Sequence, residues 1–532
     1  MIYRNVYKDN SYKTIISNHI RRLTIMEMTN TSSLTRESAS QTVQDEVMLN
    51  AAYIDGKWMA IETPATDIAD ADSYDSNYDL YDSNSGDIIA STRLCTKAQV
   101  EMAVKAAATA YSSWSQTTVS ERASYLNAIA DTMERQFGKL VGLSVLNNGK
   151  PIEEAKIDVS DAIACYRYYA NLIIEQTTWS EVSTSDSGIR LLKTYAPVGI
   201  CALIVPWNFP MVTTAWKLAP ALAAGCTVLL KPSEVTLLPE LMLGNILSDI
   251  KLPKGVVNIL PGAAEVGAAM TCHPLIDKVS FTGSNAVGEK VMSQAAKGIK
   301  DISLELGGKS AIVVCADADI DHACDLIIGG IFTNAGQICS ATSRLLVHES
   351  IAQSLFETLK VKTENLHIGD GFDTDTQMGP LVSKQQLNQV KKYFDIAAAE
   401  SLTCLTGGAV LNRQGYFAMP TIYTNVPVTS QLWLEEVFGL VLVSRTFTDD
   451  AEAISLANDS KYALAASIVS ADETAAIEMA LQIQAGHIWI NEQQIVLPES
   501  GWGGFKQSGI GRELGVDGLF AYQKSKHVLL TH

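Results

Sequence analysis

Apolar positions along the chain follow two different periods, and their order predicts the fold class. Over 98–111, 121–137 and 152–174 they recur every three or four residues, which predicts amphipathic helices. After Pro197, short apolar runs alternate with helical stretches. Strands are expected at 200–205, 227–230, 256–260 and 278–281, and helices at 212–224, 239–250, 264–270 and 286–296. A second alternating set begins at 311–314, so the pattern predicts an α/β fold with parallel sheets covered by helices.

Two segments depart from this alternation. The runs 177–182 and 189–195 flank Asp186-Ser-Gly188 and predict a β-hairpin. Residues 1–50 are basic at first and then rich in Ser and Thr. A transit peptide is one interpretation of such a start. We favour a disordered tail or a start codon placed too early, with Met26 or Met28 as the true start, because no amphipathic helix or cleavage site follows.

The net charge and the cysteines of the chain argue against several classes of function. The 532 residues hold 40 Lys and Arg against 58 Asp and Glu, a net charge of −18 that argues against binding nucleic acid or an anionic membrane. No apolar run reaches the ~18 residues of a membrane helix. The nine cysteines are scattered and form no C-x-x-C pair, so we expect neither a disulfide framework nor a metal site, and we expect a cytoplasmic location.

Ligands of such folds bind at the carboxyl ends of the strands, where three loops stand out. The loop Val205-Pro206-Trp207-Asn208-Phe209 places a side-chain amide just before a helix. In Lys231-Pro-Ser233-Glu234, Lys231 and Glu234 suit the hydroxyls of a ribose. Gly283-Ser284-Asn-Ala-Val-Gly288 joins a strand to a helix, whose first N–H groups suit a pyrophosphate. The last loop is not G-x-G-x-x-G, and a plain turn would read the same.

Two further residues are candidates for catalysis. Glu305 has Leu on both sides, and apolar surroundings raise the pKa of a carboxylate toward the range of a general base. Cys339 follows the polar stretch Asn334-Ala-Gly-Gln, where a thiol can face a cleft and be activated. A helix-capping Glu and a buried structural Cys are the alternatives.

Taken together and in this order, these segments resemble the aldehyde dehydrogenase superfamily. The resemblance rests on Pro-Trp-Asn-Phe-Pro, Lys-Pro-Ser-Glu, Phe-Thr-Gly-Ser, Leu-Glu-Leu-Gly-Gly-Lys and Gly-Gln-Ile-Cys, followed by Glu435-Glu-Val-Phe438 and Gly511-Arg-Glu-Leu-Gly515. It extends from Tyr53 to Val528. Within the superfamily, 336–351 is most similar to the betaine-aldehyde and aminoaldehyde group.

The resemblance implies covalent oxidation of an aldehyde. Cys339 would attack the aldehyde carbon, the Asn208 amide and the Cys339 N–H would hold the oxyanion, and Glu305 would activate the water that releases the acid. Lys217 and Glu513 match positions that relay protons in relatives, although a helix-face Lys and a surface Glu would read the same. Because Glu305 is present, a CoA-acylating enzyme is disfavoured. A non-catalytic structural protein on the same fold is the alternative from another class.

The resemblance also implies NAD as cofactor, because an acidic Glu234 at the ribose repels the 2′-phosphate of NADP. The expected cofactor contacts are Val205, Pro206, Trp207, Lys231, Ser233, Glu234, Gly283, Ser284, Gly288, Leu306, Glu436 and Phe438. Leu440 stands where the family motif has proline, which puts the loop behind Phe438 in doubt.

The expected substrate is betaine aldehyde, oxidised to the osmoprotectant glycine betaine, with ω-aminoaldehydes or general aldehydes as the alternative. Its pocket would be lined by Phe209, Trp216, Phe332, His487 and Trp502, because aromatic rings attract a quaternary ammonium. Phe332 stands near the position where plant betaine-aldehyde relatives carry Trp, so one wall is in doubt.

The expected architecture joins a Rossmann-type NAD-binding domain (51–176 and 196–303), an α/β catalytic domain (304–504) and a small β oligomerisation element (177–195 and 505–532). The exposed strand edges of that element would pair with another subunit, which predicts a homodimer or homotetramer.

Overall fold

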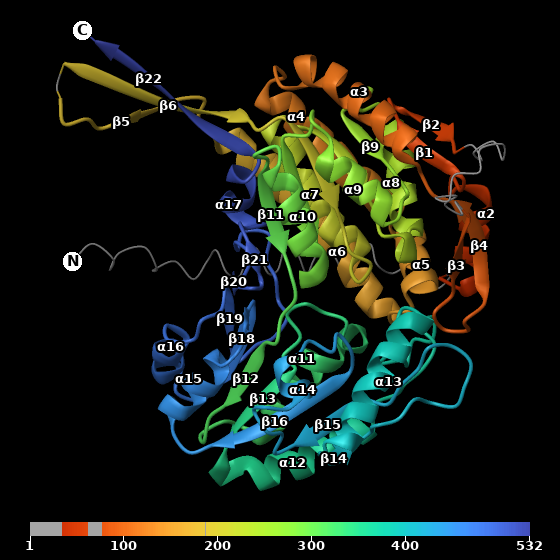
Figure 1. Cartoon of the computed structure of the whole chain (residues 1–532), viewed down its shortest axis with the longest axis vertical. Helices are drawn as coiled ribbons and strands as arrows, with labels where there is room; N and C mark the ends of the chain where they lie inside the picture. Colours follow the sequence, from red (N-terminus) through yellow and green to blue (C-terminus); the bar gives the residue numbers. More distant parts are fainter. Residues whose placement is uncertain (1–33, 62–76, 187, 532) are drawn as a thin grey trace.

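The structure, a computed structural model, describes residues 34–61, 77–186 and 188–531, and consists of two sheet-centred lobes and a projecting arm (Figure 1). Its α/β architecture, with two largely parallel sheets and flanking helices, agrees with the fold class predicted from the sequence.

The first sheet has eight strands in the order β2-β1-β9-β8-β7-β10-β11-β21, and the run from β9 to β11 is parallel. Its strands are β1 (Ala51–Ile54), β2 (Lys57–Ala60), β7 (Ile200–Ile204), β8 (Thr227–Lys231), β9 (Val257–Ile259), β10 (Lys278–Thr282), β11 (Asp301–Glu305) and β21 (Gly509–Ile510). The helices of this lobe are α3 (Lys97–Trp114), α4 (Val119–Arg135), α5 (Phe137–Asn148), α6 (Ile152–Glu175), α7 (Pro210–Ala224), α8 (Leu238–Asp249), α9 (Ala264–Cys272) and α10 (Asn285–Ala296).

The second sheet has seven strands in the order β14-β15-β16-β13-β12-β18-β19, all parallel except β14. They are β12 (Ala311–Val314), β13 (Arg344–His348), β14 (Thr403–Thr406), β15 (Thr421–Thr424), β16 (Val441–Phe447), β18 (Ala465–Val469) and β19 (His487–Ile490). Around it lie α11 (Ile320–Phe332), α12 (Glu349–Glu364), α13 (Lys384–Ala399), α14 (Gln431–Leu434), α15 (Asp450–Asn458) and α16 (Glu473–Ala480).

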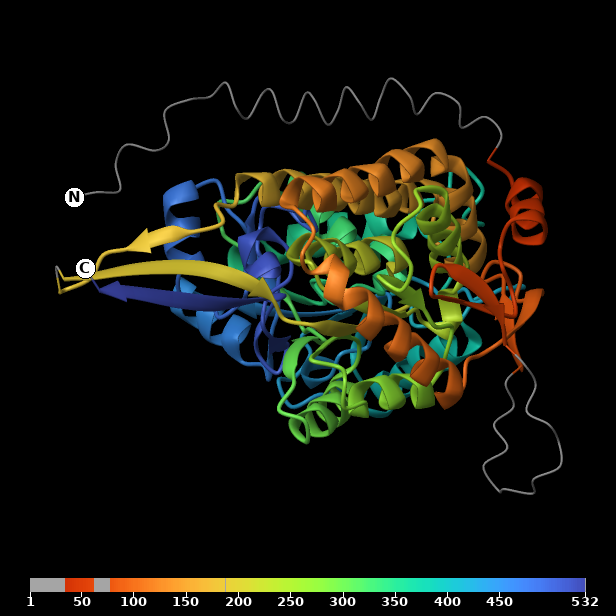
Figure 2. The same ribbon diagram turned by 90° about the horizontal axis from the view of Figure 1, so that it is seen from above.

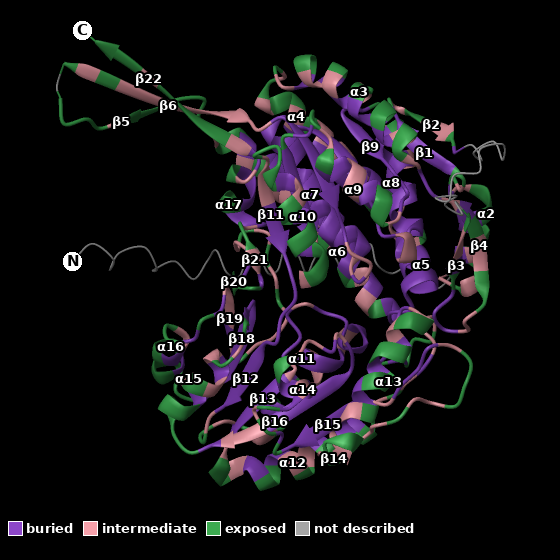
Figure 3. Cartoon of the chain, viewed as in Figure 1, coloured by how far each residue is buried: buried purple, intermediate pink, exposed green. Residues whose placement is uncertain are grey.

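The shorter elements connect or edge these lobes. They are the pair β3 (Asn77–Tyr81) and β4 (Ile88–Arg93), the pair β17 (Tyr462–Ala463) and β20 (Phe505–Lys506), helix α17 (Gly515–Phe520), and the 3₁₀ turns η2 (Glu234–Thr236) and η3 (Thr333–Gly336). In Figure 3 the strands at the centre of both sheets are buried, as expected where helices cover both faces.

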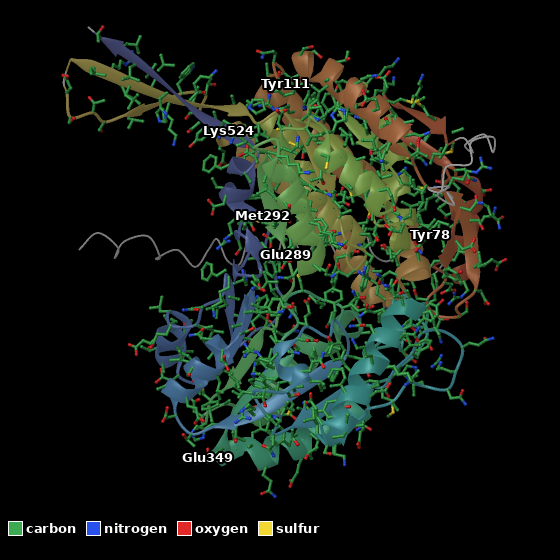
Figure 4. All side chains as sticks on the ribbon, viewed as in Figure 1. Tyr78, Tyr111, Glu289, Met292, Glu349 and Lys524 are labelled. Carbon is green, nitrogen blue, oxygen red and sulfur yellow. The ribbon has the colours of Figure 1, made fainter. Side chains whose placement is uncertain are left out.

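The arm is a three-stranded antiparallel sheet of β5 (Ser180–Val182), β6 (Ile189–Pro197) and β22 (Gln523–Thr531), and it extends away from both lobes (Figures 1 and 2). β22 pairs with β6 over its whole length, from Gln523 opposite Pro197 to Thr531 opposite Ile189. Lys524 lies at the base of the arm (Figure 4), where its Nζ is 2.5 Å from the Asp301 carboxylate. The hairpin and C-terminal strand expected from the sequence are therefore both present.

The structure differs from the sequence expectations at both ends of the chain. Within the predicted tail 1–50, the segment Arg36–Asp45 forms helix α2, which is capped by Thr35 and buries Ala39 and Val43 beside α5. The rest of that prediction, residues 1–33, lies outside the described residues. At the other end, β20 and β21 pair with strands of the two lobes, so only the segment from Gln523 onward belongs to the arm.

None of the helices in the described ranges combines the length and the apolar character that a membrane span needs.

Candidate active site

Cys339 lies at the end of a tight loop, 333–339, that we call the nucleophile loop. Three consecutive residues of this loop have left-handed backbones: Asn334 with φ of 49°, Ala335 with φ of 52° and Gly336 with φ of 76°. A side chain on Gly336 would collide with the Gly439 backbone, so glycine is required there. Non-glycine residues adopt this conformation only at a cost, which indicates that neighbouring contacts hold the loop in place.

The Asn208 side chain reaches this loop from the carboxyl end of β7. Pro210, the first residue of α7, starts the helix directly behind Phe209. Asn208 Nδ2 donates to the carbonyl oxygen of Gln337 at 2.9 Å, and its own backbone carbonyl accepts from Asn334 Nδ2 at 3.1 Å. The amide predicted to hold the oxyanion therefore contacts the backbone two residues before Cys339.

Glu305 is the last residue of β11, which excludes the helix-capping alternative. Both of its carboxylate oxygens are buried and have no hydrogen-bond partner among the described residues. Burial, and secondarily the Glu513 carboxylate, raise the pKa of Glu305 well above its usual value. A side chain on Gly308 would collide with the Cys339 carbonyl, so the loop after Glu305 lies against the nucleophile. The carboxylate thus has the environment expected of a general base.

The Cys339 thiol is half-buried, so the buried-structural alternative does not describe it. However, its pKa is raised to about 12 by burial and by the nearby carboxylates of Glu436 and Glu305. The backbone N–H groups of Ser340 and Cys339 act in the opposite direction and favour the thiolate. Activation of the thiol stays a prediction, and a positive charge brought into the site would promote it.

Lys217 and Glu513 form a buried ion pair, which corrects the alternative of a helix-face Lys and a surface Glu. Lys217 Nζ also donates to Ser280 Oγ at 3.1 Å, and Ser280 Oγ lies 3.3 Å from Glu513 Oε1. The second oxygen of Glu513 has no partner among the described groups. The pair is close enough to Glu305 to influence its pKa from both sides: Glu513 raises it and Lys217 lowers it.

The expected ribose site lies at the end of β8. Lys231 Nζ is 3.3 Å from Glu234 Oε2 and donates to the carbonyl oxygens of Pro232 and Gly262. Burial lowers the pKa of Lys231. Ser233 caps η2 by accepting from the Val235 N–H at 3.3 Å, and Val205 donates its N–H to the Lys231 carbonyl at 3.2 Å. The loops after β7 and β8 therefore lie side by side.

The loop after β10 leads into α10, whose N-cap Ser284 makes no side-chain hydrogen bond to the helix. Although the Val287 N–H donates to the Ser284 carbonyl at 3.1 Å, no side chain caps this helix start, which suits an anion. Side chains on Gly283 and Gly288 would collide with Phe281 and Leu306, so both glycines allow close packing. Thr282 Oγ1, at the end of β10, is buried and has no partner in the described part of the chain.

From the second lobe, Phe438 contacts the loop after β7 and Glu436 contacts the loop after β11. Glu436 Oε1 accepts from the Gly308 N–H at 2.9 Å, and burial raises the pKa of Glu436 to about 7. The Phe438 and Trp207 rings meet edge to face with centroids 5.3 Å apart. Phe438 has a φ of 55°, and the following Leu440 is 1% exposed, so the leucine in place of the family's proline is accommodated by burial.

Four aromatic side chains form a cluster beside this site. Trp216 of α7 contacts Trp502 with ring centroids 5.7 Å apart, and His487 of β19 contacts Trp502 at 5.3 Å and Trp489 at 4.9 Å. Burial lowers the pKa of His487 and favours the neutral imidazole. Trp502 is only 2% exposed, whereas Trp216 is half-buried, so Trp502 lies behind the accessible ring.

Phe332, expected to form one wall of this pocket, lies elsewhere. It is 2% exposed and belongs to the apolar core around the second sheet. It has no ring contact with the cluster among the described residues, so Phe332 does not replace the missing tryptophan.

Several residues of the site were not found from the sequence. Lys150 Nζ donates to the Asn208 carbonyl at 2.9 Å, Glu154 accepts from the Asn334 N–H, and Gln337 Oε1 accepts from the Val382 N–H. The one signal in the sequence was Lys150, a charged residue between Gly149 and Pro151. The pattern of apolar positions does not distinguish such a buried lysine from an exposed lysine in a loop.

A family model for the aldehyde dehydrogenase family matches residues 69–528. The chain belongs to the aldehyde dehydrogenase family. Three of the motifs that carry the resemblance, those of Asn208, Glu305 and Glu436, lie beside Cys339 or the loop that carries it.

Individual relatives are similar over most of this chain. It is 44% identical over 452 residues to a peroxisomal aminoaldehyde dehydrogenase of Pisum sativum, covering 83% of this chain and 90% of the relative. It is 42% identical over 453 residues to betaine aldehyde dehydrogenase 1 of Oryza sativa subsp. japonica, covering 83% and 89%. Among solved structures, betaine aldehyde dehydrogenase of Staphylococcus aureus in complex with NAD+ is 36% identical, with a TM-score of 0.88 and coverage of 93% and 97%.

Proposed function

We propose that the protein is an NAD-dependent aldehyde dehydrogenase that oxidises betaine aldehyde to glycine betaine. The observation that carries this proposal is the convergence of three groups. The Asn208 amide and the backbone of the nucleophile loop are hydrogen bonded, and the loop after Glu305 lies against Cys339.

The residues present fit NAD. The uncapped start of α10 suits the pyrophosphate, and Lys231 with Glu234 suits the adenosine ribose, where the acidic Glu234 disfavours a 2′-phosphate. Glu436 and Phe438 lie on the opposite side, toward Cys339. NAD+, when bound, supplies the hydride acceptor and a positive charge near the thiol. The remaining predicted contacts, including Pro206, Ser233 and Leu306, belong to this proposal.

The chain's own groups carry the other steps. The Cys339 thiolate forms a bond to the aldehyde carbon, and the Asn208 amide with the Cys339 N–H holds the resulting oxyanion, each such donor being worth roughly 3 kcal/mol. After the hydride has left this carbon, the product is a thioester on Cys339. Glu305 takes one proton from water, and the resulting hydroxide attacks the thioester and releases the acid and the Cys339 thiolate. Lys217 and Glu513 pass the proton from Glu305 outward.

The aromatic cluster supports a cationic substrate, because a ring face near a quaternary ammonium is worth about 0.5–2 kcal/mol and a neutral His487 does not repel it. The deciding experiment measures NADH release with betaine aldehyde, ω-aminoaldehydes and uncharged aliphatic aldehydes. Highest kcat/KM for betaine aldehyde supports the proposal. Highest kcat/KM for an ω-aminoaldehyde would favour the alternative raised by the similarity to the pea enzyme. No NADH with any aldehyde would favour a non-catalytic role.

We also propose that the protein is a homodimer or homotetramer. The arm carries exposed apolar side chains, with Trp179 48%, Leu529 64% and Leu530 42% exposed, and the outer edges of its end strands have no partner in the described chain. A second subunit would cover both. We further propose that the chain divides into a cofactor domain, a catalytic domain and an oligomerisation element, and that the oligomerisation element consists of the arm alone. The cytoplasmic location stays a prediction.

A further inference from the structure

The start of α6 carries three charged side chains that are directed at the two loops of the candidate active site. Lys150 precedes the helix, and Glu154 and Asp158 lie in its first two turns. The side chains of Lys150 and Asp158 are fully buried, with Nζ and Oδ2 3.3 Å apart. Removing two charges from water is costly, so a pair kept at this depth calls for further partners.

Lys150 and Asp158 find those partners at Asn208 and at the start of α7. Lys150 Nζ donates to the Asn208 carbonyl oxygen at 2.9 Å and lies 4.0 Å from the centroid of the Phe209 ring. Asp158 Oδ1 accepts from the N–H of Val212, in the first turn of α7, at 3.0 Å. The ion pair therefore fixes the backbone both at the oxyanion donor and at the helix that follows it.

Glu154 makes the equivalent contact to the nucleophile loop. Its Oε2 accepts from the Asn334 N–H at 2.9 Å, at the first of the three left-handed residues. The Asn334 side chain in turn donates to the same Asn208 carbonyl that Lys150 binds. One helix thus holds both loops, and the two loops are also joined to each other.

We propose that Lys150, held by Asp158, is a positioning residue for the Asn208 amide, and that Glu154 is a positioning residue for the loop that carries Cys339. This inference rests on the proposed function. Its physical basis is that an oxyanion donor stabilises the transition state only where the charge develops, and a displacement near 1 Å costs roughly 100-fold in rate. Because both loops are tied to α6, the helix sets the distance between donor and nucleophile.

The same geometry changes the expected role of Phe209. One face of its ring is already occupied by the Lys150 ammonium, so that face is closed to a cationic substrate. Trp216, with Trp502 packed behind it, is left as the accessible ring of the cluster for a quaternary ammonium.

The first test replaces both members of the ion pair, Lys150→Met with Asp158→Asn, so that no buried charge is left unpaired. We expect kcat to fall between about 10- and 100-fold with KM changed less than about threefold. The rate at which iodoacetamide alkylates Cys339 should stay within about twofold of wild type, because alkylation forms no oxyanion. A general loss of packing would be expected to change both rates, so a lower kcat with an unchanged alkylation rate would point to the position of the Asn208 amide.

The second test concerns Glu154. Glu154→Ala should lower kcat and also change the alkylation rate of Cys339 at least about threefold, because the loop loses the acceptor of the Asn334 N–H. Glu154→Gln keeps an oxygen that can accept this bond and should restore both values. The matched control is Glu153→Gln, one residue earlier on the same helix, whose carboxylate is 69% exposed and pairs with Lys156. It should leave both rates unchanged.

The inference is overturned if the folded double variant keeps kcat within twofold of wild type. It is also overturned if Glu154→Gln behaves like Glu154→Ala, or if turnover, alkylation and thermal stability fall in parallel in every variant. Failure of the proposed function is distinguishable, because wild type would then form no NADH with any aldehyde. In that case alkylation of Cys339 decides the Glu154 part. Hydrogen exchange of segment 205–214, expected to accelerate in the double variant, decides the Lys150 part.

Discussion

The Lys217 ammonium and the Glu513 carboxylate meet in a buried ion pair although 296 positions separate them in the chain. The contact is possible because α7 and the segment before α17 pack together, and Ser280 of β10 bonds to both partners. Since neither partner is exposed, the pair acts on its surroundings through an interior of low dielectric, where its two charges move the pKa of Glu305 in opposite directions.

The pH profile of turnover should therefore respond to each partner separately. Glu513→Gln removes the charge that raises the pKa of Glu305, so the base is ionised at lower pH and the rising limb of kcat against pH should move to lower pH. Lys217→Met should move the same limb to higher pH. Each single variant also leaves a buried charge alone, at a cost of about 3–5 kcal/mol in unfolding free energy.

Glu478→Gln, at an exposed carboxylate on α16, is the control and should leave the pH profile unchanged. Shifts of the limb in the same direction for Glu513→Gln and Lys217→Met would contradict the opposing influence on Glu305.

Cys339→Ala should abolish NADH formation with every aldehyde, a loss of at least about 1,000-fold, because no other group can form the covalent bond to the aldehyde carbon. Binding of NAD, measured by calorimetry, should stay within a few-fold of wild type, since the expected contacts to the dinucleotide come from other loops. Cys404→Ala, at an exposed thiol far along the chain, is the control. Near-normal turnover in Cys339→Ala would exclude the covalent route.

Glu305→Gln should stall the release of the acid. One equivalent of NADH per active site is expected in a burst, followed by turnover slowed about 100- to 10,000-fold, the usual contribution of general base catalysis. Stopped-flow absorbance at 340 nm (roughly the NADH band) distinguishes the burst from the steady state. The absence of any burst with an intact fold would place Glu305 before hydride transfer.

The same variant predicts a pH-dependent change in stability. The pKa of Glu305 is higher in the folded chain than in the unfolded chain, so the folded state binds this proton more tightly. Its stability is therefore reduced as pH rises above the unfolded pKa of about 4.3, and the reduction is complete only above the raised folded pKa. Glu305→Gln removes this loss. The Tm of the variant minus the Tm of wild type should therefore be larger at pH 8 than at pH 5.

The pattern of the sequence predicted most strands and helices that position the site, because buried parallel strands are short, continuous apolar runs. Strand β11 was missed: its residues Asp301–Glu305 alternate in polarity, and only the pairing with β10 defines it. Helix α2 was missed for another reason. Its polar composition resembles that of a tail, and packing beside α5 and ion pairs of Arg36 with Asp82 and Asp370, all contacts between distant segments, help to stabilise it.

For the site, the motifs pointed to Cys339, Glu305 and Asn208. Asn208 follows a predicted strand, Glu305 was singled out by the leucines on both sides of it, and Cys339 by the polar stretch before it. The positioning contacts that Lys150, Glu154 and Asp158 make at the start of α6 could not be predicted in this way. Lys150 and Asp158 are charged residues whose burial depends on α7 packing along α6, a contact between distant segments that no local pattern encodes. The prediction that Phe332 lines the substrate pocket, and not the core around the second sheet, failed for the same reason.

The arm predicts the assembly state. A mass of at least two subunits is expected by light scattering at micromolar concentration, because Leu529 and Leu530 would otherwise remain exposed. Leu529→Lys together with Leu530→Lys should shift the mass toward the monomer. Leu481→Lys, at an apolar residue 83% exposed on the second lobe, is the control and should not change the mass. An active monomer in wild type would contradict the proposal.

The aromatic cluster predicts how the substrate is selected. Trp502→Ala removes the ring that contacts both Trp216 and His487, so KM should rise about 2- to 30-fold more for betaine aldehyde than for an uncharged aldehyde of similar length. Because Trp502 is 2% exposed, its loss also opens a cavity that costs about 3–5 kcal/mol in stability. Trp502→Phe, which keeps an aromatic face, should retain most of the preference.

The matched control for this cavity is Trp433→Ala. Trp433 is 1% exposed but belongs to the core around the second sheet, where it packs against Arg344, so its loss should destabilise the fold without changing the ratio of the two KM values. An equal rise of KM for both aldehydes in Trp502→Ala would mean that this ring supplies only apolar surface. Recognition of the quaternary ammonium would then have to come from Trp216 alone, and Trp216→Ala measured with the same pair of aldehydes would decide whether the cluster recognises the charge at all.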